Sequence, residues 1–240
     1  REVRFRPNGE HGGPMVRRGR IGSVHTIRVE MYGGFGEPQN RYSPPVEVQS
    51  PPAGFDFDMW LGPAPEAPFS FERCGSTYRF IYDYGGGNIC EWGPHMLDIA
   101  MLGNNTEFTG PTRVEGTAEF PGDGLFNTPL SFQARYEFAN GVTMYCETGS
   151  EELALYSGAM VRFEGDDGWI QSGFSGCDAE PESLRTEKLG PDDDPVVVTA
   201  HEGMEHRAFL DAVKGEQPCL DSVEAAHRAA PTLAYGVDQS

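Results

Sequence analysis

Three residues with acid–base side chains lie close together near the middle of the sequence. Glu91 and His95 are four residues apart, and Asp98 follows three residues later. On a helix this spacing puts side chains on one face, and histidine is the side chain that most readily exchanges a proton near neutral pH. The pattern favours proton transfer to or from a small substrate. The other interpretation is an ordinary helix start that the carboxylate–histidine pair only stabilises.

A run of three glycines, residues 85–87, comes just before these groups. Glycine allows the backbone to approach a ligand closely because it has no side chain, so we expect Gly86 and Gly87 to line a substrate. The run does not match the GxGxxG fingerprint of dinucleotide sites, and no strand–loop–helix unit surrounds it. This chain alone is therefore expected to bind no nicotinamide cofactor.

The sequence gives no support for a metal site. There is no HExxH motif, and the five cysteines are scattered without a CxxC pair. Structural zinc sites and small disulfide scaffolds both require close, regular ligand or cysteine spacings. We expect neither of them here.

The composition excludes several classes of partner. Acidic residues number 37 against 18 basic ones, which gives a net charge of −19. Such a surface repels nucleic acid and anionic lipid, and no apolar run is long enough to span a membrane. The chain opens on Arg1 rather than Met, so we interpret it as processed, trimmed or partial. A cytoplasmic location is favoured, with an exported form as the alternative if a signal preceded Arg1.

The hydrophobic pattern predicts several strands and a smaller number of helices. Alternating residues predict strands at 24–31, 112–120 and 130–138. Asn140-Gly141 predicts a hairpin into residues 142–146, with a turn of type I′ or close to it, and residues 160–171 predict a second hairpin. Residues 196–198 are a further candidate strand.

Helical spacing appears at 94–102, 201–213 and 222–233, and a helix ended by glycine is expected near residues 15–22. Residues 33–70 are rich in glycine and proline and are expected to form a long irregular segment;. We predict a single α+β domain over residues 1–240, with an open, mostly antiparallel sheet, helices on one face and no Rossmann domain. Apolar side chains in both registers of the strands, such as Met144 and Tyr145, favour a partner on the open face.

Four segments resemble the Gfo/Idh/MocA oxidoreductases, in the order in which that family has them. They are residues 16–22 (VRRGRIG), residues 60–65 (WLGPAP), residues 82–100 around the glycine run, and residues 206–213 (HRAFLDAV). Together they span most of the chain, and the likeness is to the family's C-terminal substrate domain. The resemblance implies a sheet of five to seven strands that pairs with a second copy through its open face.

The resemblance also implies roles for the candidate residues. In the family an aspartate and a histidine four residues apart help to move the proton of the substrate hydroxyl, and these positions match Glu91 and His95. Gly86, Gly87, Asp98 and Trp60 are then expected to contact a sugar or polyol. NAD or NADP is implied as the cofactor, bound by an N-terminal Rossmann domain with a Glu-Lys-Pro lysine, and neither feature is in this sequence.

Two functions of different class follow from these expectations. The first is the substrate-binding and oligomerising half of a sugar or cyclitol oxidoreductase, whose cofactor domain is a separate part. The second is a non-catalytic relative that binds carbohydrate or assembles with itself. The longer Glu91 side chain in place of aspartate, and the missing lysine, are the features that favour the second.

Overall fold

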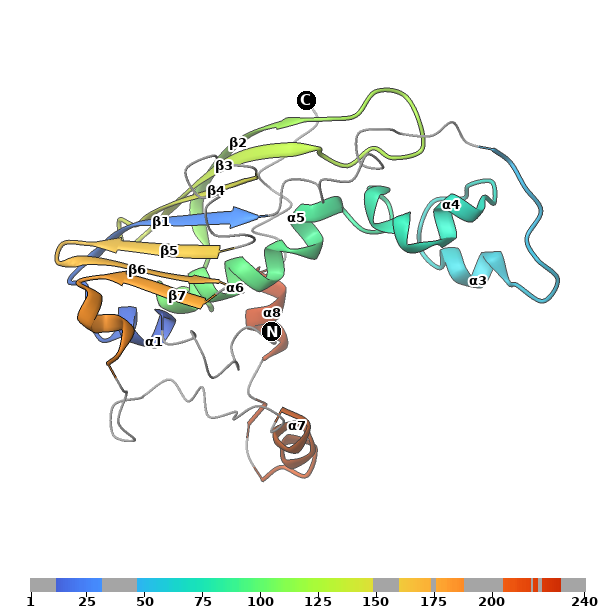
Figure 1. Ribbon diagram of the computed structural model, residues 1–240. Helices are drawn as coiled ribbons and strands as arrows, with labels where there is room; N and C mark the ends of the chain where they lie inside the picture. Colours follow the sequence, from blue (N-terminus) through green and yellow to red (C-terminus); the bar gives the residue numbers. More distant parts are fainter. Residues whose placement is uncertain are drawn as a thin grey trace.

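An open β-sheet with helices on one face forms the centre of the molecule (Figure 1). The computed structural model describes residues 12–31, 47–148, 160–173, 176–187, 205–216, 218–219 and 222–229. The predicted α+β class and the mostly antiparallel sheet are confirmed. Expected features at residues 32–46, 196–198, 201–204 and 230–233 lie outside the described residues.

The sheet has seven strands in the order β2-β3-β4-β1-β5-β6-β7. Only β1 and β4 run parallel, and every other neighbouring pair is antiparallel. The strands are β1 (Val24–Met31), β2 (Pro111–Glu119), β3 (Ser131–Phe138), β4 (Thr143–Thr148), β5 (Met160–Gly165), β6 (Gly168–Gly173) and β7 (Gly176–Glu180). The first strand in the sequence is therefore the central one in space.

The two hairpins form where the sequence predicts them, but the first turn is of another type. A type I′ turn needs positive φ at both central residues, whereas Gly141 has φ of 88° and Asn140 is not among the residues with positive φ. Gly141 N donates to Phe138 O at 3.0 Å, which closes a type I turn followed by a left-handed glycine;. The Asn140 side chain explains the difference, because its oxygen accepts from Val142 N and its amide donates to Asn104.

One face of the sheet is buried against helix α6 (Gly93–Gly103), which packs on β1 and β5. The strand registers place the apolar side chains of this face in a row across six strands: Tyr136, Met144, Ile27, Phe163, Ile170 and Ala179. All six are at most 5% exposed. Burial of a row like this is the main stabilising contribution to such a fold.

Helix α1 (Gly12–Arg17) lies beside α6 and closes its C-terminal end. Arg17 Nη1 donates to the carbonyl of Leu102 at 3.3 Å and to Glu107 at 2.9 Å, and Nη2 donates to Asn105 at 2.7 Å. The carbonyl of Leu102 also accepts from Asn105 N at 3.1 Å, so the arginine adds a second hydrogen bond to the last turn and opposes the negative end of the helix dipole;. The glycine after α1 that the sequence predicts is Gly19, at φ of 69°.

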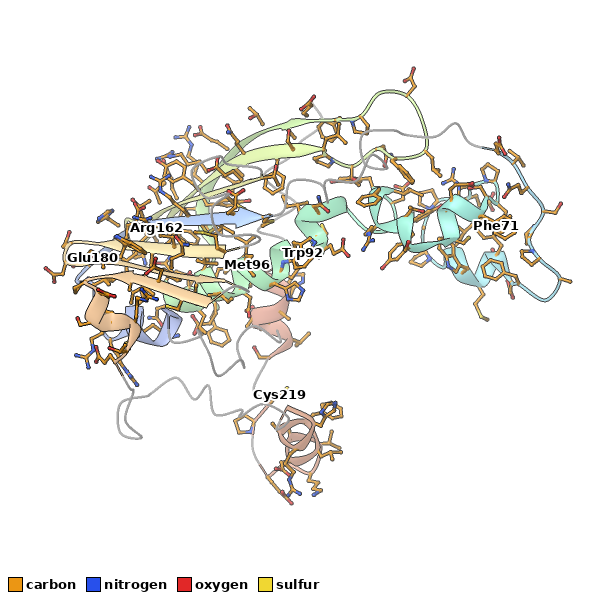
Figure 2. The ribbon with its side chains drawn as sticks, viewed as in Figure 1. Phe71, Trp92, Met96, Arg162, Glu180 and Cys219 are labelled. Carbon is orange, nitrogen blue, oxygen red and sulfur yellow. The ribbon has the colours of Figure 1, made fainter. Side chains whose placement is uncertain are left out.

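A segment with three short helices extends from one end of the sheet (Figure 1). It contains α3 (Phe57–Leu61), capped by Asp56, α4 (Phe71–Cys74), capped by Ser70, and the 3₁₀ helix η2 (Ser76–Phe80). Figure 2 shows Phe71 far out on this segment. The aromatic rings of this segment contact one another in a continuous series: Phe55, Phe57, Phe69, Phe71, Trp60 and Tyr84.

Three helical elements follow β7 in the sequence. They are η3 (Glu182–Arg185), α7 (Glu205–Val213) and α8 (Val223–Ala229). Helix α8 packs against α6, and Arg228 Nη1 donates to the carbonyl of Thr109 at 2.8 Å. None of the helices in the described ranges combines the length and hydropathy that crossing a bilayer requires.

The contact between α6 and β5 gives a stability prediction. A Cβ added to Gly103 would lie 2.4 Å from two ring atoms of Phe163, which is fully buried. Gly103→Ala should therefore lower the free energy of unfolding by about 1–3 kcal/mol, although helix propensity alone would favour alanine by about 1 kcal/mol. Gly122→Ala is the control, because nothing lies within 4 Å of its Cβ position. Denaturant unfolding that finds Gly103→Ala as stable as the control would contradict the close packing.

Candidate functional site

The candidate residues lie where α5 (Gly87–Glu91) continues into α6. Trp92 joins the two helices with helical dihedral angles, φ of −87° and ψ of −30°. Its N–H donates to Asn88 O at 2.8 Å, and the next turn continues from its carbonyl. The spacing of Glu91 and His95 by one helical turn is therefore kept across the junction, with Pro94 in the first turn of α6;.

The three glycines at residues 85–87, the last of which begins α5, are each packed against protein atoms. Gly86 and Gly87 have φ of 70° and 72°, the left-handed region that glycine enters without strain;. A Cβ on Gly86 would lie 2.5 Å from the sulfur of Cys90, and one on Gly87 would lie 2.7 Å from Thr128. Gly85 is closed off in the same way by the backbone of Arg79. Internal packing alone thus requires glycine at these positions, whether or not a ligand approaches them.

Glu91 is held by an arginine that the sequence analysis did not identify. Nη1 of Arg79 donates to Glu91 Oε1 at 2.5 Å, and the two side chains are 31% and 33% exposed. The other carboxylate oxygen, Oε2, has no exposed surface and accepts no hydrogen bond from the described residues. Arg79 escaped notice because it lies twelve residues before Glu91, on another element. The only available signal was a basic side chain close to the glycine run in a very acidic chain.

His95 is half-buried on the first turn of α6, and its ring lies against that of Trp92. The ring centroids are 5.9 Å apart with the planes tilted by 51°. Figure 2 shows Trp92 at the junction of α5 and α6. Asp98, three residues further along the helix, is only 4% exposed. The structure therefore brings His95 to the surface beside Trp92 and places Asp98 within the helix packing.

Trp60 reaches the start of the glycine run through Tyr84. The two rings meet edge to face at 5.3 Å, and Phe57 stacks on the other side of Trp60 at 5.8 Å. The hydroxyl of Tyr84 accepts a hydrogen bond from Arg73 Nη1 at 3.3 Å. The segment that carries Trp60 thus contacts the loop that leads into α5.

The thiol of Cys90 is unsuited to nucleophilic chemistry. Cys90 is an exposed residue of α5, yet its sulfur packs against Gly86 and burial raises the pKa of the thiol. A raised pKa lowers the fraction of thiolate, the reactive form, at neutral pH. Within the described ranges no three His, Cys, Asp or Glu residues are grouped as metal ligands would be.

The glycine run does not have the features of a dinucleotide phosphate site. Phosphate sites at helix starts need free backbone N–H groups and open space in front of them. Here α5 has five residues, and protein atoms fill the position of the missing side chain at each glycine of the run. The glycine run therefore lacks the features of a dinucleotide phosphate site.

Comparison with known proteins identifies the fold. Among solved structures, GenD2 from gentamicin A biosynthesis, in complex with NAD, is 15% identical with a TM-score of 0.55, and the match covers 98% of this chain and 58% of that one. A putative myo-inositol dehydrogenase from Sinorhizobium meliloti is 13% identical with a TM-score of 0.51, covering 97% and 59%. The WlbA dehydrogenase from Chromobacterium violaceum, in complex with NADH and UDP-GlcNAcA, is 9% identical with a TM-score of 0.55, covering 92% and 53%.

The chain thus spans between about half and three-fifths of the length of these three structures. A search of curated protein sequences finds no match. A profile of the oxidoreductase family's C-terminal alpha/beta domain matches residues 14–227. The chain therefore belongs to the Gfo/Idh/MocA oxidoreductase family and carries the C-terminal α/β domain of that family.

Proposed function

We propose that this chain is the substrate-binding and oligomerising half of an NAD(P)-dependent oxidoreductase that acts on a sugar or cyclitol. The observation that carries the proposal is the α5–α6 junction, where a packed glycine loop leads into the turn that bears Glu91 and His95. Related folds were solved as dehydrogenases, one with NADH and a sugar nucleotide. The cofactor is assigned to a separate domain, because the match is to the family's C-terminal domain and the glycine run lacks the features of a dinucleotide phosphate site.

His95 is the residue that takes the proton in this proposal. Its imidazole accepts the proton of the hydroxyl to be oxidised, which is the task of a general base with a pKa near neutrality. Glu91 binds an adjacent hydroxyl or orients the ring, Gly86 and Gly87 lie along the substrate, and Trp60 forms a wall. Asp98 is the proposed partner of the other ring nitrogen of His95 or of a substrate hydroxyl.

Replacement of the imidazole tests this assignment. In the complete enzyme, with a cofactor-binding half present, His95→Ala should lower kcat by roughly a hundredfold, the usual scale for loss of a general acid or base. His227→Ala, an exposed histidine on α8, is the matched control. Steady-state oxidation of a panel of sugars and cyclitols gives the measurement. Unchanged turnover of His95→Ala would leave His95 as a structural residue.

The full chain by itself should not bind the cofactor. Titration calorimetry with NAD and with NADP should give no heat of binding at micromolar concentrations, because the glycine loop is filled and the net charge is −19;. The complete enzyme is the positive control. Micromolar affinity of the chain alone would show that the dinucleotide site lies within these residues.

The sheet face turned away from α6 is the proposed contact with a second copy. Its polar and aromatic side chains form one row across the strands: Glu115, Arg135, Tyr145, Arg28, Arg162, Gln171 and Asp178. Arg28 lies over the ring of Tyr145 at 5.5 Å, and Arg162 lies over that of Trp169 at 4.1 Å. A shallow groove of about 380 Å³ runs over β2, β3 and β4. Arginine and aromatic side chains of this kind are enriched at interfaces between proteins.

Sedimentation measurements test the contact. The native chain should sediment as a dimer or larger oligomer at micromolar concentration. Tyr145→Glu should shift it towards monomer, because the variant removes an aromatic side chain from the contact and adds a charge that must lose its water there;. Val223→Glu is the control, since Val223 is 85% exposed on α8. A native chain that is monomeric at high micromolar concentration would contradict this part of the proposal.

One observation favours the non-catalytic alternative. Both oxygens of Glu91 are engaged or covered, Oε1 by Arg79 and Oε2 by surrounding protein. A carboxylate held in this way can support a binding site without taking part in chemistry. Sugar binding by the complete protein without any NAD(P)-dependent turnover is the result that would select this alternative.

A further inference from the structure

We propose that Arg79 is a positioning residue of the candidate site, which fixes both the carboxylate of Glu91 and the start of the glycine loop. Arg79 is not expected to contact the substrate. The inference rests on the proposed function, because Glu91, Gly86 and Gly87 are the groups that would contact a sugar or polyol.

The first contact is the charge-assisted hydrogen bond to Glu91. The 2.5 Å distance between Arg79 Nη1 and Glu91 Oε1 is short, and about two thirds of each side chain is buried. Exposed surface pairs contribute little, but hydrogen bonds between ions shielded from water are the stronger kind. Glu91 Oε2 has lost its water without gaining a bond from the described residues. The carboxylate therefore depends on Arg79 for its counterion and its direction.

The second contact is made by the backbone of Arg79. A Cβ on Gly85 would lie 2.4 Å from Arg79 Cα and 2.9 Å from Arg79 O. The N–H of Gly85 donates to Ile81 O at 3.0 Å, which closes the turn that follows η2. Arg79 therefore contacts both ends of this segment. Its backbone packs against Gly85 at the start of the glycine loop, and its side chain binds Glu91 at the end of α5.

The guanidinium is itself restrained by the ring of Phe80. Its central carbon lies 5.4 Å from the ring centroid, and Phe80 is buried in a small core with Ile81, Leu125 and Phe126. A planar guanidinium can stack on a ring and keep its hydrogen bond at the same time, whereas a lysine ammonium cannot reproduce both contacts. The core beneath η2 thus sets the direction of Arg79, and Arg79 sets that of Glu91.

A purely structural ion pair and a positioning residue predict different results. A structural pair affects only stability. A variant that restores the ion pair should then restore both stability and ligand binding. A positioning residue affects ligand binding beyond its effect on stability. Exchanging the two residues keeps an ion pair between η2 and α5 but removes the carboxylate from position 91. If Arg79 is a positioning residue, this variant should regain the attachment of α5 but not ligand binding.

The experiment compares four variants of the full chain with the native one: Arg79→Met, Arg79→Lys, the exchange Arg79→Glu with Glu91→Arg, and the control Arg228→Met. Arg228 pairs with Glu224 at 2.6 Å on α8. Amide hydrogen exchange of residues 85–91 reports the positioning, and calorimetry with myo-inositol and with glucose as probes reports binding. The hydrogen-exchange readout does not depend on the proposed function.

Arg79→Met should speed exchange of residues 85–91 and weaken binding of the probe by about tenfold or more, as expected when a charge-assisted hydrogen bond is lost. Arg79→Lys should fall between Arg79→Met and the native chain. The exchanged pair should recover slow exchange but not probe binding, and Arg228→Met should change neither. If Arg79→Met does not fold, Arg79→Lys against Arg228→Met makes the same comparison.

Native exchange rates at residues 85–91 in Arg79→Met, or in Arg79→Lys where only that variant folds, would overturn the inference. Recovery of probe binding in the exchanged pair would also overturn it, because a structural pair would then be sufficient. If the native chain binds neither probe, the proposed substrate class fails. Faster exchange of residues 85–91 in Arg79→Met would then support only the attachment of this segment to Arg79 and would overturn the role in binding.

Discussion

The close packing of α6 on β1 and β5 is the constraint on which the rest of the structure depends. The helix is buried along most of its length, so it is apolar on nearly every side. Gly103 lets it approach Phe163, and Arg17 closes its C-terminal end. Its N-terminal end is thereby fixed at the edge of the packed core, and this is where His95 and the junction with α5 lie. A helix that moved on the sheet would move the candidate site with it.

Local patterns in the sequence predicted the strands well because each strand carries its own signal. Residues 24–31 and 130–138 alternate, and they form β1 and β3 with nearly the expected bounds. The short strand β7 has little alternation and takes its form from pairing with β6, so the sequence did not indicate it. The turn at Asn140 was placed correctly but assigned the wrong type, because a distant residue, Asn104, binds its side chain.

The candidate site shows the same division between local and distant information. The helical spacing of Glu91 and His95 and the need for glycine at residues 85–87 were readable from the sequence. The partner of Glu91 was not, because Arg79 reaches it from η2 rather than from the same helix. The glycines at residues 85–87, which the sequence predicts to face a ligand, also pack against Arg79, Cys90 and Thr128. The sequence pattern identified the candidate side chains, but their hydrogen-bond and packing partners are set by tertiary contacts.

The central place of β1 has a consequence for how this domain can be divided. The strand lies between β4 and β5, and its parallel partner follows it by more than a hundred residues. Without β1 the sheet separates into a three-stranded part and a second three-stranded part with two unpaired edges between them. A fragment that keeps the sheet must therefore begin before Val24, and one that starts at the glycine loop has no continuous sheet. Pairings between residues so far apart in the sequence raise the contact order, and a higher contact order is associated with slower folding.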